Sequence, residues 1–166
     1  MKQVLLLVCL FGTCLLHAQD TSQQVTAGRM NAGSQQSKPY VILISADGFR
    51  YDFARKYGAV NLLRLAGDGI RADYMQPSFP SLTFPNHYSI VTGLYPAHHG
   101  LVDNSFYDRQ RKELYSMSNR NMVQDAYWYG GTPLWVLAEK QQLLSASYYW
   151  VGSEAAEQGI APSYFY

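Results

Sequence analysis

The hydrophobic and polar positions along the chain predict alternating strands and helices. Continuous apolar runs predict three strands, at residues 40–45, 70–75 and 145–150, and the first has the composition of a strand buried on both faces. Three stretches with helical spacing are bounded by an N-cap residue, a proline or a glycine. These predicted helices span residues 61–69, 84–93 and 133–142. The resulting order of elements predicts an α/β sandwich.

The first 38 residues differ in composition from the rest. A lysine near the start, an apolar run over residues 4–16 and the small residue Ala18 predict a secretory signal peptide over residues 1–18. The apolar run is shorter than the roughly 20 residues of a membrane span, so no transmembrane segment is expected. Cleavage would export the chain to the periplasm or the medium and remove both cysteines. Residues 19–38 are polar and rich in Gln, Ser and Gly, which favours a flexible leader.

Composition and charge argue against some classes of protein function. A hydrophobic content of 48% in 166 residues provides for a sizeable core and argues against disorder. The formal net charge of +1, without a basic run, argues against a nucleic-acid partner bound through phosphate neutralisation. The last residues, 161–166, end in three aromatic side chains, which favours a chain that stops within a domain. The sequence does not indicate an oligomeric state.

Three residues could carry chemistry, and each has a simpler alternative. Asp47 follows the first predicted strand, where α/β folds place ligands, but Asp-Gly is also a common turn pair. Thr83 precedes Pro85 at the start of a predicted helix, so it is either a nucleophile near the positive end of the helix dipole or an N-cap. Asn104 can donate to an oxyanion or form an Asx turn.

The histidines do not have the spacing of a zinc site. His87 lies on a predicted helix and is expected to be a packing residue. His98 and His99 precede Gly100 and are expected to be a solvated or capping pair.

Several motifs in order resemble those of the nucleotide pyrophosphatase/phosphodiesterase family of the alkaline phosphatase superfamily. The resemblance covers about residues 40–160. It begins with the buried strand that runs into Ser-x-Asp-Gly-Phe-Arg and continues with Pro-Ser-Leu-Thr-Phe-Pro-Asn-His-Tyr-Ser at residues 80–89. Val-Thr-Gly-Leu-Tyr-Pro, Asp-Asn-x-Phe-Tyr-Asp and Tyr-Gly-Gly-Thr-Pro-Leu-Trp follow at residues 91–96, 103–108 and 129–135.

The resemblance implies a fold, a reaction and a set of site residues. The implied fold is a three-layer α/β sandwich with a mostly parallel sheet, of which residues 39–166 would form the N-terminal part and which would be incomplete at its C-terminus. The implied reaction is hydrolysis of phosphodiester or pyrophosphate bonds in nucleotide-type small molecules, with two Zn²⁺ as cofactors. Asp47 matches a metal ligand, and Thr83 matches the metal-bound nucleophile. Asn104 matches a donor to a phosphate oxygen, and Phe84 matches an aromatic residue that packs against a nucleotide base.

The resemblance also implies that the site is incomplete within these 166 residues. The family draws its remaining metal ligands from sequence further along, and two ligands do not hold two tetrahedral zinc ions. The chain alone is therefore expected to be inactive and to function as part of a longer enzyme. Two alternatives remain at this point: a phosphomonoesterase of the same superfamily, and a non-catalytic remnant or binding module.

Overall fold

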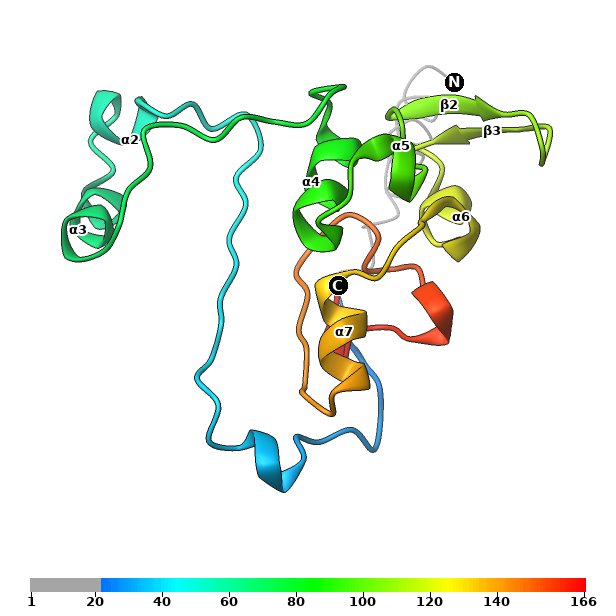
Figure 1. Ribbon diagram of the computed structural model, residues 1–166, viewed down its shortest axis with the longest axis horizontal. Coiled ribbons are helices and arrows are strands. Elements are labelled where there is room, and N and C mark those ends of the chain that lie inside the picture. Colours follow the sequence, from blue (N-terminus) through cyan, green and yellow to red (C-terminus); the bar gives the residue numbers. More distant parts are fainter. Residues whose placement is uncertain (1–21) are drawn as a thin grey trace, which may run out of the picture.

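The computed structural model of the chain describes residues 22–166, so the predicted signal peptide lies outside the described residues. The helices and strands are short and joined by long connections (Figure 1). In chain order they are β1 (Gln24–Val25), a 3₁₀ turn η1 (Gly33–Gln35), α2 (Phe53–Lys56), α3 (Val60–Asp68), α4 (Thr83–Thr92), α5 (Pro96–His99), β2 (Ser105–Asp108), β3 (Glu113–Ser116), α6 (Arg120–Val123), η2 (Ala126–Trp128), α7 (Leu134–Lys140), η3 (Glu157–Gly159) and β4 (Tyr164–Phe165). No helix among the described residues is long and apolar enough to cross a membrane.

The core is built largely from aromatic side chains. Tyr88 of α4 and Tyr115 of β3 are completely buried, and Trp128 and Trp135 are almost so. Tyr88 meets the ring of Tyr129 edge to face at 5.2 Å between centroids. Large rings bury much apolar area for each residue ordered, so a few short elements suffice to enclose a core.

The three predicted helices are present. The first is α3, Val60–Asp68, and the third is α7, Leu134–Lys140. The second, α4, begins at Thr83 and ends at Gly93, whose φ of 68° is a left-handed conformation that glycine adopts without strain. Tyr88 and Val91 of α4 face the core.

The predicted strands are not found. Residues 40–45 and 70–75 form no strand in the described part of the chain, and residues 145–150 contribute a single bridge, from Ala146 to Tyr164. The described strands form two antiparallel pairs, β1 with β4 and β2 with β3, in place of a mostly parallel sheet. An inner strand requires hydrogen-bonding partners on both sides, and residues 22–166 provide none for residues 40–45.

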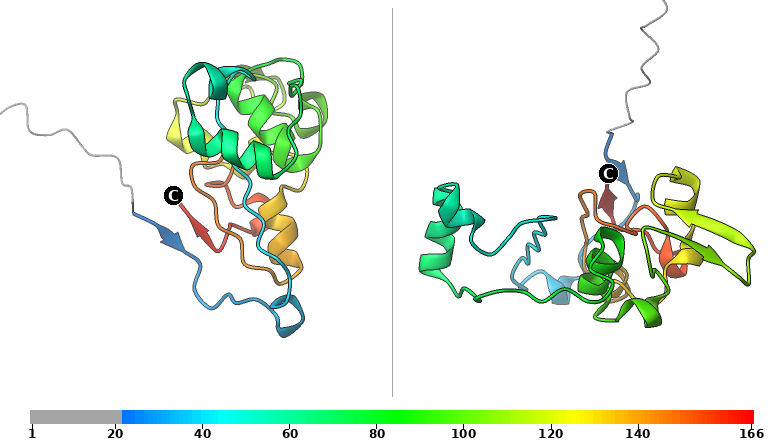
Figure 2. Two further views of the ribbon diagram at one scale, coloured as in Figure 1. Left: turned by 90° about the vertical axis from the view of Figure 1, so that its left-hand side faces the viewer. Right: turned by 90° about the horizontal axis from the view of Figure 1, so that it is seen from above.

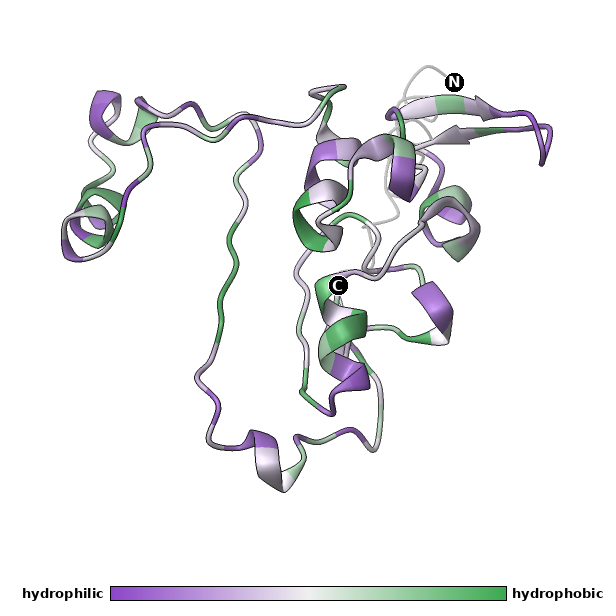
Figure 3. Cartoon of the chain, in the orientation of Figure 1, coloured by the Kyte–Doolittle hydropathy of each residue, from purple (hydrophilic) through white to green (hydrophobic). Residues whose placement is uncertain are grey.

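Residues 40–82 form an arm that extends away from the packed part of the molecule (Figures 1 and 2). The arm carries α2 and α3, and its first segment is apolar yet open to solvent (Figure 3). Val41, Ile42 and Ile44 are 83–89% exposed. The apolar pattern of residues 40–45 predicted a buried strand, but these side chains are not buried by the described residues.

The hairpin of β2 and β3 was not predicted from the sequence. Ser105 pairs with Ser116 at its base and Asp108 with Glu113 at its tip. The polar turn between the strands includes Lys112, which has a φ of 55°. The hairpin packs Phe106 against Trp128, with 5.7 Å between ring centroids, and this contact joins it to the core.

The predicted leader, residues 19–38, makes specific contacts in its described part. β1 pairs with β4, and Arg29 forms an ion pair with Glu139 of α7 at 3.1 Å. The side-chain oxygen of Asn31 accepts a hydrogen bond from the backbone N–H of Leu144. The polar composition of this segment gave no indication of these contacts.

Candidate active site

Thr83 and Asp47 lie next to each other although 36 residues separate them in sequence. The Thr83 hydroxyl donates a hydrogen bond to Asp47 Oδ2 at 3.1 Å. Asp47 is held in a turn at Gly48, whose φ is 64°. The N-cap of α4 is Leu82, and its side chain makes no capping bond. The Thr83 hydroxyl is therefore directed at a carboxylate, whereas an N-cap hydroxyl would accept from a backbone N–H.

Asn104 lies against the first turn of the same helix. Its Oδ1 accepts a hydrogen bond from the backbone N–H of Phe84 at 3.0 Å. Because an N–H can only donate, this contact fixes the orientation of the carboxamide and leaves Nδ2 as the outward donor. The hairpin positions Asn104, since the backbone N–H of Met117 donates to the Asn104 carbonyl at 2.9 Å. The structure thus brings Asp47, Thr83 and Asn104 together at one helix end.

The surroundings of this helix end favour negative charge. The N-terminus of α4 carries the partial positive charge of the helix dipole, which stabilises a bound anion, whereas the Phe84 N–H is already bonded to Asn104 and Pro85 has no N–H. Thr83 and Asn104 are half-buried and Asp47 is exposed, so the helix end is open to solvent. The ring of Phe84 is also half-buried and packs partly against the aromatic core.

The histidines have structural roles in the described residues. His87 Nδ1 donates to the Thr83 carbonyl at 2.8 Å, and the His87 ring lies edge to face with Trp150. His98 and His99 were expected to be a solvated or capping pair; His98 is exposed, but His99 is 1% exposed, so the solvated alternative is wrong for His99. His99 Nδ1 accepts from Leu101 N–H, and burial lowers the pKa of the imidazole. The cause of its burial is the close packing of α5 against α4, which places the ring edge to face with Tyr88.

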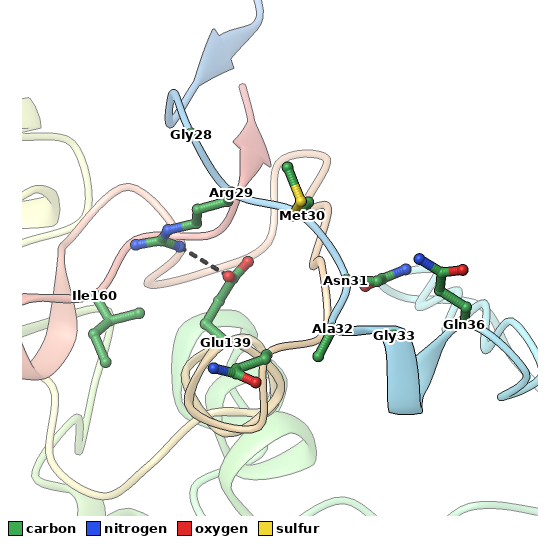
Figure 4. Close-up of a pocket in the computed structure, with 10 residues that line it drawn as sticks. Gly28, Arg29, Met30, Asn31, Ala32, Gly33, Gln36, Glu139 and Ile160 are labelled. Carbon is green, nitrogen blue, oxygen red and sulfur yellow. Dashed lines mark ion pairs between the residues drawn. The ribbon is translucent and has the colours of Figure 1, made fainter.

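A pocket of about 500 Å³ lies elsewhere in the molecule, between residues 28–36 and the end of α7 (Figure 4). The Arg29–Glu139 ion pair crosses its wall. None of the candidate site residues lines this pocket.

Comparison with known proteins identifies the family. Residues 41–166 match the family model for type I phosphodiesterase/nucleotide pyrophosphatase. The chain belongs to this family. It is thereby a member of the nucleotide pyrophosphatase/phosphodiesterase group within the alkaline phosphatase superfamily.

The family relatives are considerably longer than this chain. The chain is 41% identical over 141 residues to a pyrophosphatase/phosphodiesterase of Schizosaccharomyces pombe, a match that covers 84% of the chain and 29% of the relative. It is 38% identical over 149 residues to the venom phosphodiesterase of Naja atra, covering 89% of the chain and 18% of the relative. The chain thus spans less than a third of the length of these curated relatives.

Solved structures support the same assignment. Murine ectonucleotide pyrophosphatase/phosphodiesterase 5 matches with a TM-score of 0.68 and 27% identity, over 72% of the chain and 32% of the neighbour. An inactive threonine-to-alanine variant of that murine protein, in complex with AMP, matches with a TM-score of 0.69 and 26% identity, over 74% and 33%. The described residues therefore share part of the fold of these phosphodiesterases.

Two oxygen atoms at the helix end have the chemistry of metal ligands. The Asp47 carboxylate and the Thr83 hydroxyl lie 3.1 Å apart, and oxygen donors at this spacing can bind one divalent ion together. Among residues 22–166, no group of three His, Cys, Asp or Glu side chains could hold a metal ion. Further ligands would have to come from outside the described residues.

Sequence reasoning missed one residue close to this site. Asn86 hydrogen-bonds the segment that leads into Thr83, a role that its place in the sequence motif does not by itself indicate. Its position in the first turn of α4, three residues after Thr83, was the available signal.

Proposed function

We propose that the chain provides the nucleophile and the phosphate-binding groups of an exported, zinc-dependent phosphodiesterase or nucleotide pyrophosphatase, within a polypeptide that carries the rest of the family's catalytic domain. The observation that supports this most directly is the convergence of Asp47, Thr83 and Asn104 at the N-terminus of α4. The presence of an inactive threonine-to-alanine variant among the structural neighbours also supports a threonine nucleophile.

Each residue has a distinct part in the proposed reaction. The Thr83 oxygen attacks phosphorus, its hydroxyl proton passes to the leaving group or to solvent, a nucleotidyl–threonine phosphodiester forms, and the alcohol or phosphate leaving group departs. Asn104 Nδ2 donates to a non-bridging phosphate oxygen as negative charge develops. The partial positive charge at the N-terminus of α4 stabilises the same charge. Water then cleaves the ester, which releases the nucleoside monophosphate and regenerates the Thr83 hydroxyl.

Metal ions and an aromatic side chain complete the proposed site. Asp47 and Thr83 would hold zinc, with other ligands from the remaining part of the domain. When bound, the metal ions would lower the pKa of the threonine hydroxyl and neutralise phosphate charge. The exposed part of the Phe84 ring would pack against the base of a nucleotide-type substrate.

The test compares Thr83→Ala with a matched variant of the full-length protein. Thr92→Ala removes the threonine hydroxyl at the opposite end of α4 and serves as the control. The substrate is a p-nitrophenyl ester of a nucleoside 5′-phosphate, and p-nitrophenyl phosphate reports monoesterase activity. We expect Thr83→Ala to lose diester turnover while zinc content, measured by plasma emission, is largely retained through the other ligands. Turnover that persists in Thr83→Ala would exclude Thr83 as the nucleophile, and faster cleavage of the monoester would exclude the diesterase assignment.

A further inference from the structure

The backbone segment that leads into Thr83 has few hydrogen bonds within itself. Residues 78–82 precede α4 and include Pro80, which has no backbone N–H to donate. The segment belongs to no helix or strand, and its one internal backbone hydrogen bond runs from Leu82 N–H to the Pro80 carbonyl at 2.8 Å. Its carbonyl groups therefore require partners from outside the segment.

One side chain provides most of these partners. Asn86 Oδ1 accepts from the backbone N–H of Ser78 at 2.8 Å and from its hydroxyl at 3.2 Å. Asn86 Nδ2 lies within hydrogen-bonding distance of three carbonyl oxygens, those of Ser78 at 3.2 Å, Pro80 at 2.9 Å and Leu82 at 3.0 Å. Because the Ser78 N–H can only donate, the amide orientation is unambiguous. One carboxamide thus holds both ends and the middle of the segment.

A second contact connects the segment to the core. The hydroxyl oxygens of Ser78 and Ser89 lie within hydrogen-bonding distance of each other at 3.2 Å, and Ser89 in turn contacts His99 Nε2 at 3.0 Å. Since His99 Nδ1 accepts from a backbone N–H, the neutral ring carries its proton on Nε2 and donates it to Ser89. His99 is buried, so this chain of hydrogen bonds ends at a fixed point.

We propose that Asn86 is a positioning residue for the Thr83 nucleophile, an inference that rests on the role proposed above for Thr83. The carboxamide holds Leu82, the residue directly before Thr83, and thereby sets where the chain enters α4. The two contacts that define the site, Thr83 with Asp47 and Phe84 with Asn104, both depend on that entry point. A displacement of about 1 Å in a reacting group can lower the rate by about 10².

The helix itself does not depend on Asn86 for its packing. Tyr88 and Val91, which are 0% and 3% exposed, hold α4 on the core, whereas Asn86 is only half-buried. Loss of the carboxamide should therefore loosen residues 78–83 and leave the rest of α4 in place. Such a local effect would distinguish a positioning role of Asn86 from a general contribution to the stability of the fold.

The experiment uses Asn86→Ala and Asn86→Asp in the full-length protein, with Thr92→Ala as the matched control. Thr92 also makes a side-chain bond to the backbone of α4, from its hydroxyl to the Tyr88 carbonyl at 2.8 Å, but at the far end of the helix. Asp at position 86 keeps the shape and the acceptor for Ser78 but loses the donors to the three carbonyls. The measurements are kcat and KM on the nucleoside p-nitrophenyl phosphodiester, Tm, and amide hydrogen exchange of residues 78–84.

We expect both Asn86 variants to lower kcat by about 10–100-fold, with KM within about threefold of the wild type and a Tm close to that of Thr92→Ala. Exchange should become faster in residues 78–84 and stay unchanged in the second half of α4. Unchanged exchange at residues 78–84, or a kcat equal to that of Thr92→Ala, would overturn the positioning role. A failure of the proposed function can be distinguished from a failure of the positioning role. If Thr83 is not the nucleophile, Thr83→Ala retains turnover, regardless of the result for the Asn86 variants.

Discussion

Glu157 is a carboxyl group enclosed in the core. It is 1% exposed, and its Oε2 accepts a hydrogen bond from Trp135 Nε1 at 3.1 Å. Its Oε1 has no hydrogen-bonding partner among the described residues. Burial raises the pKa of Glu157 to about 8, and the bond from Trp135 opposes this only in part. The carboxyl is therefore mostly protonated in the folded protein at neutral pH.

This raised pKa predicts that the free energy of unfolding falls as pH rises from about 4.5 to 8. Within that range the folded chain keeps a proton that the unfolded chain has lost, and above pH 8 the loss of stability is complete. Glu157→Gln is neutral at every pH and should remove this contribution, with a stabilisation on the order of 4 kcal/mol at pH 8. The measurement is urea unfolding at pH 5 and pH 8.

Among the nearby titratable groups, His99 adds an opposite dependence on pH because burial lowers its pKa, but it does so equally in the wild type and in Glu157→Gln, so the difference between the two proteins isolates Glu157. Tyr88 and Tyr129 face Glu157, and burial raises the pKa of both phenols above the range tested. Glu139→Gln serves as a control, because the pKa of Glu139 is lowered and the variant should therefore lose a similar amount of stability at pH 5 and at pH 8. The same dependence of stability on pH in the wild type and in Glu157→Gln would contradict the prediction.

Asn104 offers a second test at the scale of one residue. Asn104→Asp keeps the acceptor for the Phe84 N–H and replaces the outward N–H donor with a charged oxygen. We expect kcat for the diester to fall by about 10²–10³, the usual cost of one lost oxyanion donor, with at least as large a loss as in Asn104→Ala. Tm should change little, since the backbone contact to Met117 is kept. Wild-type turnover in Asn104→Asp would limit Asn104 to a structural role.

The sequence allowed the site residues to be proposed but not the residues that support them. Asp47, Thr83 and Asn104 were recognisable from motifs, and the structure places them at one helix end. Asn86 and Glu157 gave no such signal, because their importance lies in contacts with distant backbone and rings. A single polar side chain has the same appearance in a sequence whether it is solvated or buried.

At the scale of elements, Glu139 joins three segments of the chain. Its Oε1 accepts hydrogen bonds from the backbone N–H and hydroxyl of Ser145 at 3.0 and 2.7 Å and from those of Ser163 at 2.9 and 2.5 Å. Its Oε2 pairs with Arg29, and the Glu139 side chain is 7% exposed. Burial opposes ionisation, but the bonds from Ser163 and Ser145 and the charge of Arg29 outweigh it, so the pKa of Glu139 is lowered.

We therefore expect Glu139→Ala to destabilise the fold by about 3 kcal/mol, the cost of breaking a buried charged network. Because the pKa of Glu139 is lowered, the stability that it provides is present at neutral pH and is lost as pH falls through the folded-state pKa. Chemical unfolding at pH 7 measures the cost. Glu113→Ala is the control, because Glu113 pairs with Arg111 in the exposed hairpin and should cost less than about 1 kcal/mol. Equal losses in the two variants would show that Glu139 does not hold the segments together.

The helices were more predictable than the strands for a physical reason. A helix satisfies its own backbone, and the local signals of α4, from Pro85 at its start to Gly93 at its end, were sufficient to locate it. A strand depends on neighbours that can lie anywhere in the sequence. The apolar runs at 40–45 and 70–75 have no such neighbours within the described residues, and the β2–β3 hairpin was missed because its strands have only four residues each.

At the scale of the whole molecule, the exposed arm is consistent with the partial coverage found in the comparisons, and so is the proposal that the zinc site is shared with other parts of the domain. The structural neighbours share the fold of most of this chain, yet the shared part is only about a third of their own length. Val41 and Ile42 are exposed here because no described segment covers them. By the same reasoning, Asp47 and Thr83 would be two ligands of the proposed zinc site, and the other ligands would lie outside the described residues.

This predicts how zinc binding divides between the 166-residue chain and a polypeptide with the complete family domain. Asp47 and Thr83 alone should hold zinc weakly, so the 166-residue chain should contain well below one tightly bound zinc ion after dialysis. Its Tm should not change on addition of a chelator, because ligand-linked stabilisation requires binding to the folded state. The polypeptide with the complete domain should hold two zinc ions and lose diester hydrolysis when a chelator removes them.

Asp47→Asn tests whether Asp47 is a zinc ligand in the complete domain. The substitution removes the carboxylate charge and keeps the shape, and in the complete domain it should lower zinc content and activity together. In the 166-residue chain it should change neither zinc content nor Tm. Two tightly bound zinc ions in the 166-residue chain would show that residues 1–166 contain a complete ligand set, and the division of the site proposed here would be wrong.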